Sequence, residues 1–252
     1  MFTAMLTTAA ELNHFYLAVD RETYAAIEAS GFLKSEFAAF EKRTTVRADR
    51  TYTAIYFYGT HTYFELFDAA AEKRKPGESG IAFGVDAVSD EPTGISLEKH
   101  LITRGWLGAQ LPWFYTLSAQ DGQEITLWLM EYHPGFLAKW NPAAGGPGGI
   151  TRDAVLRRYK AVLPHTPEDP MIEDVAGLTV AVSSKERPPI EHWIRDIGSV
   201  FPVQFVEPEA GEHGIREVRF KLRRPSAKIQ EVRFGGKSVL RFQPGGAALW
   251  TF

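Results

Sequence analysis

One histidine and two glutamates occupy matching places in a sequence pattern that the chain repeats. His14 lies in the run NHFYLAVD, and Glu65 follows it 51 residues later (65 − 14) in TYFELF. Glu131 lies in LWLMEY, 51 residues (131 − 80) after Gly80 of the run SGIAFGVD. Imidazoles and carboxylates ligate divalent metal ions, and both kinds of side chain transfer protons in enzymes. These residues are therefore the first candidates for a site with chemistry.

The runs that carry them belong to an internal repeat. Residues 13–20, 79–86 and 176–183 are short apolar runs, each followed by a helical stretch and then by β-like segments. In the third copy, Gly177 occupies the position of His14 and Arg241 occupies the position of Glu65. These two residues are 64 positions apart (241 − 177), so this copy is longer. Glycine and arginine side chains do not bind cations, and the third copy is expected to be structural.

Alternating polarity and cap residues predict the elements that hold the candidates. In the first run every second side chain shares a face, which places His14 beside Tyr16. Asp20 stands at a helix N-cap before a helix over residues 21–30. A second helical piece is expected over residues 32–43.

The segments that follow are β-rich. Residues 44–59 and 61–69 are predicted strands with a tight turn at Gly59, and Tyr63, Glu65 and Phe67 share one face. The second copy predicts a helix over residues 91–105, with His100 on the surface near its end. Its last strand, residues 124–134, is expected to point one set of side chains the same way: Leu127, Leu129, Glu131 and His133.

A β-α-β-β-β module used in tandem, with a histidine in the first strand and a glutamate in the last, resembles the vicinal oxygen chelate superfamily of glyoxalases and extradiol dioxygenases. The resemblance covers residues 11 to about 135, with a weaker third copy after residue 175. It implies an α+β fold in which tandem β-α-β-β-β modules form a curved mixed sheet around a cavity, with a third, degenerate module.

The expected domain organisation follows from these boundaries. The paired modules (about 11–70 and 79–137) fill residues 1–140, a Gly/Pro-rich linker with a short helix spans 141–170, and the third module spans 171–252. A lone third module would have to cover the first two or pair with a second chain, so a homodimer is possible.

The resemblance also implies a metal site. The first and last strands of the two modules would converge and bring His14, Glu65 and Glu131 together as ligands. The fourth corner, a second histidine in glyoxalase-like members, is Gly80 here, which argues against the iron dioxygenase pattern. One imidazole and two carboxylates suit Zn, Mn, Fe, Ni or Mg. Such an ion would stabilise an oxyanion, with Glu65 or Glu131 as a catalytic base.

The expected function is therefore a glyoxalase-like, metal-dependent isomerase, lyase or dioxygenase acting on a small oxygenated substrate. Tyr16, Tyr63 and Phe67 would line the substrate cavity, Arg47 could clamp a substrate carboxylate, and His133 could act at the cavity mouth. Each of these has a structural alternative. Aromatic residues at strand spacing are ordinary core, arginine runs are usually solvated, and His133 suits a turn.

Two other functional classes fit the same residues. In the first, a metal-free protein of this fold binds an aromatic or apolar compound in the cavity. In the second, a non-catalytic scaffold uses a basic face of the third module. The basic residues there are Arg216, Arg219, Lys221, Arg223, Arg224, Lys228, Arg233, Lys237 and Arg241. Basic residues that alternate with apolar ones are also the normal pattern of a sheet with one wet face.

The composition of the chain limits the classes of protein to which it can belong. The 252 residues are 44% hydrophobic with a formal charge of −3, which predicts a globular protein with no nucleic-acid or membrane partner. The chain has no cysteine, which excludes thiolate ligands and disulfides. No signal peptide or membrane-length apolar stretch is evident, so a cytoplasmic location is expected. Nucleotide-binding, serine-hydrolase and zincin motifs are absent from the sequence.

Overall fold

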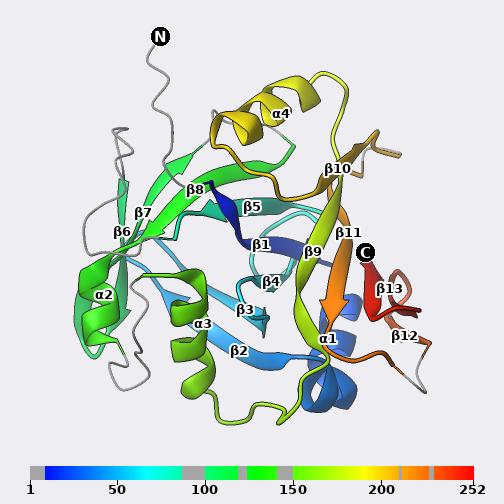
Figure 1. Cartoon of the computed structure of the whole chain (residues 1–252), viewed down its shortest axis with the longest axis horizontal. Helices are drawn as coiled ribbons and strands as arrows, with labels where there is room; N and C mark the ends of the chain where they lie inside the picture. Colours follow the sequence, from blue (N-terminus) through cyan, green and yellow to red (C-terminus); the bar gives the residue numbers. More distant parts are fainter. Residues whose placement is uncertain (1–8, 87–99, 119–123, 141–149, 210–211, 227–229) are drawn as a thin grey trace.

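The computed structural model describes residues 9–86, 100–118, 124–140, 150–209, 212–226 and 230–252, which form two β-sheets and a few helices (Figure 1). The α+β fold class predicted from the sequence is confirmed. Within the described residues, no helix has the length and apolar character that crossing a bilayer requires.

The first sheet contains eight strands in the order β2-β3-β4-β1-β5-β8-β7-β6. Each half is one module whose first strand lies parallel to its last. The halves join where β1 and β5 run antiparallel. The strands of the first module are β1 (Glu11–Val19), β2 (Ala39–Val46), β3 (Thr51–Tyr58) and β4 (Tyr63–Asp68), and those of the second are β5 (Ser79–Gly84), β6 (His100–Trp106), β7 (Ala109–Ser118) and β8 (Thr126–Tyr132).

Local sequence features explain where helix α1 begins and where the chain returns to the sheet in the first module. Asp20 caps helix α1 (Arg21–Ala29) by accepting a hydrogen bond from the backbone N–H of Thr23, as predicted. The predicted second helix over residues 32–43 is wrong. Only a short π-helical turn, η1 (Leu33–Phe37), forms there, because residues from Ala39 onward pair with β3 along the sheet edge.

The second module departs from its prediction in the same way. Residues 91–99 of the predicted helix lie outside the described residues, and from His100 onward the chain is strand β6 rather than helix. Helix α2 (Pro134–Lys139) follows β8, and helix α3 (Arg152–Ala161) begins at the N-cap Thr151. Helix α3 is the short helix expected within residues 141–170.

The second sheet has six strands in the order β10-β9-β11-β14-β13-β12. Its strand order differs from that of the first two modules, because the strand after helix α4 (Arg187–Asp196) pairs directly with β9 in parallel. This is the form that the degenerate third copy takes. The strands are β9 (Ile172–Ala181), β10 (Val203–Val206), β11 (Gly214–Leu222), β12 (Glu231–Phe234), β13 (Ser238–Gln243) and β14 (Ala247–Thr251).

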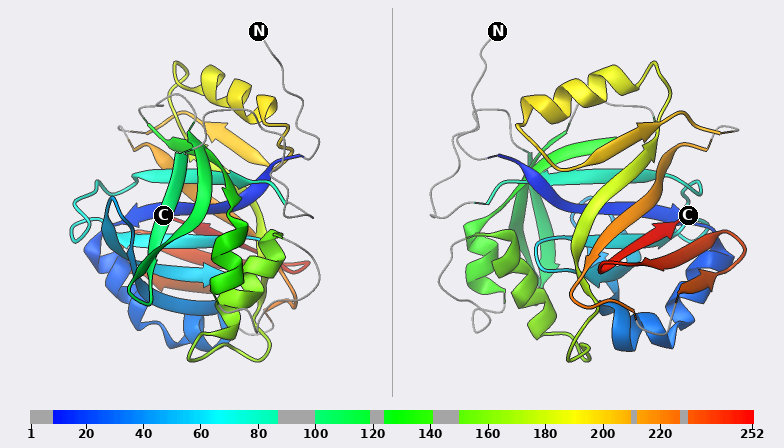
Figure 2. Two further views of the ribbon diagram at one scale, coloured as in Figure 1. Left: turned by 90° about the vertical axis from the view of Figure 1, so that its left-hand side faces the viewer. Right: turned by 45° about the vertical axis from the view of Figure 1, so that its right-hand side comes forward.

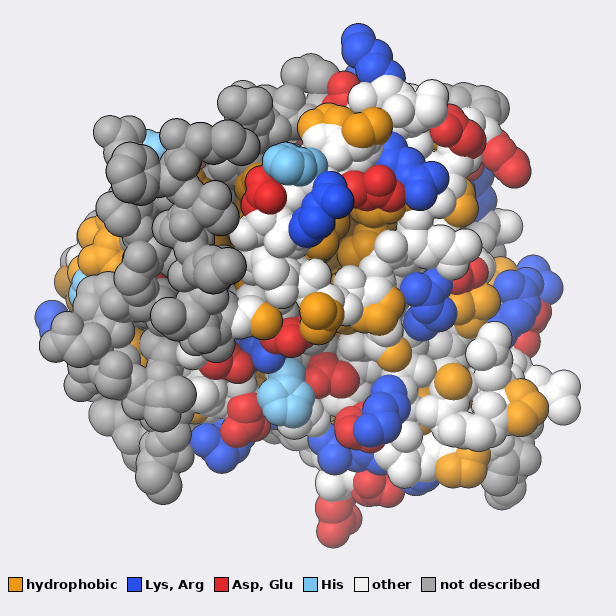
Figure 3. Space-filling model, turned by 45° about the horizontal axis from the view of Figure 1, so that its top comes forward, with side chains coloured by type: hydrophobic (Ala, Val, Ile, Leu, Met, Phe, Trp, Pro, Cys, Tyr) orange, Lys and Arg blue, Asp and Glu red, His pale blue; other side chains and the backbone are white. Residues whose placement is uncertain are grey.

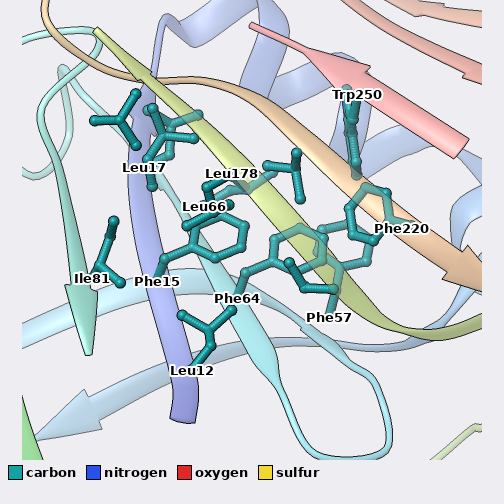
Figure 4. Close-up of a cluster of buried hydrophobic side chains, with 14 of the residues drawn as sticks. Leu12, Phe15, Leu17, Phe57, Phe64, Leu66, Ile81, Leu178, Phe220 and Trp250 are labelled. Carbon is teal, nitrogen blue, oxygen red and sulfur yellow. The ribbon is translucent and has the colours of Figure 1, made fainter. Parts of the chain in front are cut away.

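One face of the first sheet packs on the second sheet through a continuous aromatic core (Figures 2 and 4). The rings of Phe57 and Phe64 stack at 4.8 Å, and Trp250 of the second sheet packs edge-on against both. Phe220 also reaches Phe64, at 5.6 Å. The second sheet therefore covers the first two modules.

The opposite face of the first sheet curls around a second cluster of buried side chains, which includes Trp140 and Tyr159 of the segment around α3. The two edge strands approach each other at one isolated β-bridge between Arg47 and Arg104. A sheet whose ends meet in this way encloses space on its concave side. This is the side on which the candidate site lies.

Candidate functional site

A cavity of about 550 Å³ opens on the concave side of the first sheet. Most strands of both modules contribute to its walls, and charged side chains lie among aromatic ones. The lining residues are His14, Tyr16, Arg47, Arg50, Tyr52, Tyr63, Glu65, Phe67, Arg74, Glu78, His100, Ile102, Trp113, Phe114, Thr116, Ser118, Thr126 and Trp128. Its size and mixed lining are typical of small-molecule sites.

His14 and Glu65 meet on the wall of this cavity. The Nε2 atom of His14 lies 3.9 Å from Oε1 of Glu65, and each residue is only 6% exposed. The strands that carry them are neighbours, with Tyr16 of β1 paired with Glu65 and His14 with Tyr63. Parallel pairing within one module thus brings together two residues that are 51 positions apart (65 − 14).

The surroundings of His14 favour the neutral imidazole. The register of β1 against β5 shifts between Leu12 and His14, and at this irregularity the Asn13 side chain lies 2.9 Å from Nδ1 of His14. When Asn13 Oδ1 accepts the Nδ1–H, the Nε2 atom is left as an acceptor facing Glu65. The ring stacks on Tyr63 at 4.4 Å. Burial lowers the pKa of His14 to about 3.

Burial has the opposite effect on the carboxyl of Glu65, whose pKa it raises to about 7. Three arginines, Arg43, Arg50 and Arg74, and a hydrogen bond from Tyr56 limit the rise. Arg43 lies 4.1 Å from the Tyr56 ring centroid. At neutral pH the contact between the two buried groups is therefore not an ion pair, because the imidazole is neutral and the carboxyl is about half protonated.

Gly80, the expected fourth corner of the metal site, is covered by aromatic rings. A Cβ atom at this position would lie 2.6 Å from Tyr16 Cε1 and 2.8 Å from Trp128 Cζ3. Trp128 also packs edge-on against His14 at 5.3 Å. The two rings thus use the space that a larger side chain at Gly80 would need.

Glu131 does not join His14 and Glu65. Trp128 and Thr126 of β8 face the cavity, and Glu131 is an odd number of positions from Trp128 (131 − 128), so it points to the other face of the sheet. There it lies in a small recess with Leu129 and Tyr115. In the first module Glu65 pairs with Tyr16, and in the second module Trp128 pairs with Ala82, the counterpart of Tyr16. Trp128 is therefore the structural counterpart of Glu65, and the alignment of the two modules predicted from the sequence is three residues out of register.

The metal site expected from the sequence therefore does not assemble from its three predicted ligands. In the described part of the chain, no group of three or more His, Asp or Glu side chains is arranged to hold a metal ion. His14 and Glu65 supply two donors, which does not fit a resident ion held by three protein ligands.

The predicted substrate-binding residues divide into two groups. Tyr16, Tyr63, Phe67 and Arg47 line the cavity, whereas His133 lies at the turn before α2, where its Nδ1 accepts a hydrogen bond from the backbone N–H of Gly135 at 3.0 Å. Arg47 reaches the cavity while its guanidinium makes two 2.8 Å hydrogen bonds to Asp49.

Sequence reasoning missed several cavity residues. Trp128 alternates along β8 with Leu127, Leu129 and Glu131, the face on which the sequence predicts the site, and Arg74 lies in the charged connection between the two modules. Arg50 belongs with Arg43 and Arg47 to the arginine run that could clamp a substrate carboxylate or form a solvated face. His100, predicted on a helix, lies at the cavity rim as the first residue of β6. No periodic signal marks Arg50, Arg74 and His100, because none of them lies inside a strand predicted from the sequence to face the site.

Of the nine basic residues noted in the third module, Lys228 lies outside the described residues, and six of the other eight form an ion pair with an acidic side chain. Ion pairs connect Lys221 with Glu173 at 2.8 Å and Arg241 with Glu231 at 2.9 Å. On the face drawn in Figure 3, Lys and Arg side chains alternate with Asp and Glu instead of gathering in one basic patch. This distribution gives no support to the scaffold alternative.

Residues 12–205 match the family described as "Family of unknown function (DUF5829)". The chain belongs to this family. No curated protein matches the DUF5829 chain. Its curled mixed sheet of paired modules is compatible with a vicinal oxygen chelate-like fold.

Two solved structures resemble this DUF5829 protein at a distance. One is described as a hypothetical protein from Staphylococcus aureus, with 12% identity, a TM-score of 0.39 and coverage of 85% of this chain and 82% of that one. The other is a xylose isomerase-like TIM barrel/4-hydroxyphenylpyruvate dioxygenase fusion protein, with 10% identity and a TM-score of 0.33. The match covers 86% of this chain and 31% of the fusion protein.

Proposed function

We propose that this chain binds a small, planar, oxygenated molecule in its cavity, and that Glu65 donates a proton or a hydrogen bond to it. The observation that carries the proposal is the position of Glu65. Its buried carboxyl, with a pKa of about 7, faces a neutral imidazole on the wall of a cavity of about 550 Å³. A carboxyl with a pKa near the working pH is suited to act as both acid and base.

The walls of the cavity support a planar ligand. Tyr16 lies edge-on to Phe67 at 5.6 Å and near Trp128 at 6.1 Å, so three rings border the space beside Glu65. Flat aromatic surfaces stack on planar molecules and exclude water. A proton shared between the ligand and Glu65 would then move in a largely desolvated setting, where the charge of either partner matters most.

His14 would position this proton. Its Nε2 atom is an acceptor 3.9 Å from Glu65, which is wider than a hydrogen bond, so both groups can hydrogen-bond one ligand oxygen that lies beside them in the cavity. An entering hydroxyl could donate to His14 while accepting from the protonated carboxyl of Glu65. Proton transfer of this kind supports an isomerase or lyase type of chemistry on the bound molecule.

We further propose that the chain is a relative of the vicinal oxygen chelate superfamily that uses this cavity without a resident ion. The paired modules and the meeting of His14 with Glu65 support the relationship. The aromatic cover over Gly80 and the position of Glu131 on the other face support the metal-free form.

The test is the pH dependence of binding for a neutral probe, the amide of para-(hydroxymethyl)benzoic acid, measured by calorimetry on metal-free protein. The probe does not titrate, so changes in affinity report on the protein. We expect the affinity to fall about tenfold as the pH rises through the pKa of Glu65, because a carboxylate cannot donate to the probe's oxygen. Glu65→Gln should remove this pH dependence because its amide does not titrate.

Glu131→Gln is the matched control, since it changes a buried glutamate on the opposite face of the same sheet. It should bind the probe with the pH dependence of the unmodified protein. The proposal is overturned by an affinity that does not change with pH, or by the same pH dependence in Glu65→Gln. Binding that appears only after Zn²⁺ or Mn²⁺ is added would support the metal-dependent alternative instead.

A further inference from the structure

The cavity contains one arginine whose charge no acidic side chain of the described residues neutralises. Three arginines line the cavity. Arg47 is held by Asp49, and Arg74 pairs with Glu78. Arg50 lies over the ring of Tyr52, with its guanidinium carbon 5.1 Å from the ring centroid, and has no ion pair in the described part of the chain.

Glu65 does not neutralise Arg50. No salt bridge joins the two among the described residues, and burial raises the pKa of the Glu65 carboxyl to about 7, so about half of it carries no charge at neutral pH. Of the other acidic lining residues, Glu78 is committed to Arg74. The cavity therefore has an excess of one positive charge when Glu65 is protonated, and an anionic group on a ligand would neutralise it.

A chain of ring contacts leads from Arg50 through Tyr52, Phe67 and Tyr16 to the strand position beside Glu65. Arg74 holds its guanidinium carbon 4.8 Å from the ring centroids of both Tyr16 and Phe67, and Tyr52 lies edge-on to Phe67 at 5.6 Å. These rings connect the side on which Arg50 lies with the side formed by His14 and Glu65. A ligand that spans them must be flat in its middle and polar at both ends.

We infer that the ligand class is a planar aromatic monoacid, whose carboxylate pairs with Arg50 while an oxygen at the far end of the ring reaches Glu65. This inference rests on the proposed function. A guanidinium binds a carboxylate through two parallel hydrogen bonds, which fixes the orientation of the ring. A monoanion matches the single uncompensated charge, whereas a dianionic phosphate would exceed it.

The experiment compares para-(hydroxymethyl)benzoate with its neutral amide, which has nearly the same shape. We expect the unmodified protein to bind the acid at least about tenfold more tightly than the amide, because a hydrogen bond to a charged group is stronger than one to a neutral group. Arg50→Gln should weaken binding of the acid by about tenfold or more and leave the affinity for the amide unchanged. Arg157→Gln, on the exposed side of α3, is the control and should change neither affinity.

The outcomes separate the ligand class from the proposed function. If the amide binds as tightly as the acid, or if Arg50→Gln leaves the preference for the acid intact, the ligand class is overturned while pH-dependent binding of the amide still supports the role of Glu65. If the acid binds through Arg50 without any effect of Glu65→Gln, the ligand class stands and the role of Glu65 fails. If neither compound binds, the ligand class is overturned.

Discussion

The imidazole of His14 and the carboxyl of Glu65 lie 3.9 Å apart from Nε2 to Oε1, and neither carries a full charge at neutral pH. If both groups were charged, they would form an ion pair, and a ligand would have to break it in order to bind. Here burial holds the imidazole neutral and the carboxyl near its midpoint, so the pair remains open to a ligand that supplies or accepts a proton.

Glu65→Gln should alter how the free energy of unfolding depends on pH. Burial raises the pKa of Glu65 from 4.5 to about 7, so the folded chain retains a proton that the unfolded chain releases. The protonated carboxyl therefore contributes stability at low pH, and about 3 kcal/mol of it is lost as the pH rises from about 4.5 to about 7.

His14 acts in the opposite direction. Its pKa falls from 6.5 to about 3 on folding, so stability increases as the pH rises from about 3 to about 6.5. The two effects oppose each other in the unmodified protein between about pH 4.5 and 6.5. In Glu65→Gln only the effect of His14 remains, and urea unfolding should show stability rising across that range. If the free energy of unfolding changes with pH in the same way in the unmodified protein and in Glu65→Gln, the shifted pKa of Glu65 is contradicted.

Gly80→Ala should destabilise the protein and reduce the cavity. The added Cβ would lie 2.6 Å from Tyr16 Cε1, so Tyr16 or Trp128 must move, at a cost of about 1 to 3 kcal/mol in the free energy of unfolding. Gly31→Ala is the control, because nothing lies within 4 Å of its added Cβ. Urea unfolding and affinity for the benzoate probe measure both effects. Equal stability of the two variants would show that the rings do not occupy this space.

Asp174→Ala should weaken the connection between the two sheets. Its carboxylate accepts hydrogen bonds from the backbone N–H groups of His61 and Thr62, at 2.9 Å and 3.0 Å, in the turn between β3 and β4. Thr62 is buried, so its N–H would lose a partner out of reach of water. We expect a loss of about 2 to 4 kcal/mol in the free energy of unfolding.

Asp196→Ala provides the comparison for this variant. Asp196 is an exposed residue of α4 that pairs with His192, and its removal should cost less than about 1 kcal/mol. Thermal or urea unfolding of the two alanine variants checks the prediction. A loss of similar size in both would mean that Asp174 does not support the turn.

Metal content provides a separate check on the site. We expect protein purified without an affinity tag to contain much less than one transition metal ion per chain, because His14 and Glu65 supply only two donors in the described site. Elemental analysis of the unmodified protein and of Glu65→Gln measures this directly. About one equivalent of metal that disappears in the variant would restore the metal-dependent function expected from the sequence.

The sequence alone predicted what depends on neighbours along the chain or within one module. Asp20 is followed by helix α1 because an N-cap acts on the next three residues. The side chains of Tyr16, Tyr63 and Phe67 face the same cavity because strand side chains alternate with a period of two. His14 and Glu65 meet because the first and last strands of their module are direct neighbours.

Tertiary structure alone decided what depends on the register and closure of the sheet. The three-residue offset between the modules moves Glu131 to the opposite face, because any odd shift reverses the side on which a strand residue points. The curl that brings Arg47 next to Arg104 also brings Arg50 and Arg74 to the cavity. The acidic partners of Arg47 and Arg74 are close neighbours along the chain, Asp49 and Glu78, but only the tertiary structure brings these arginines and Arg50 to one cavity.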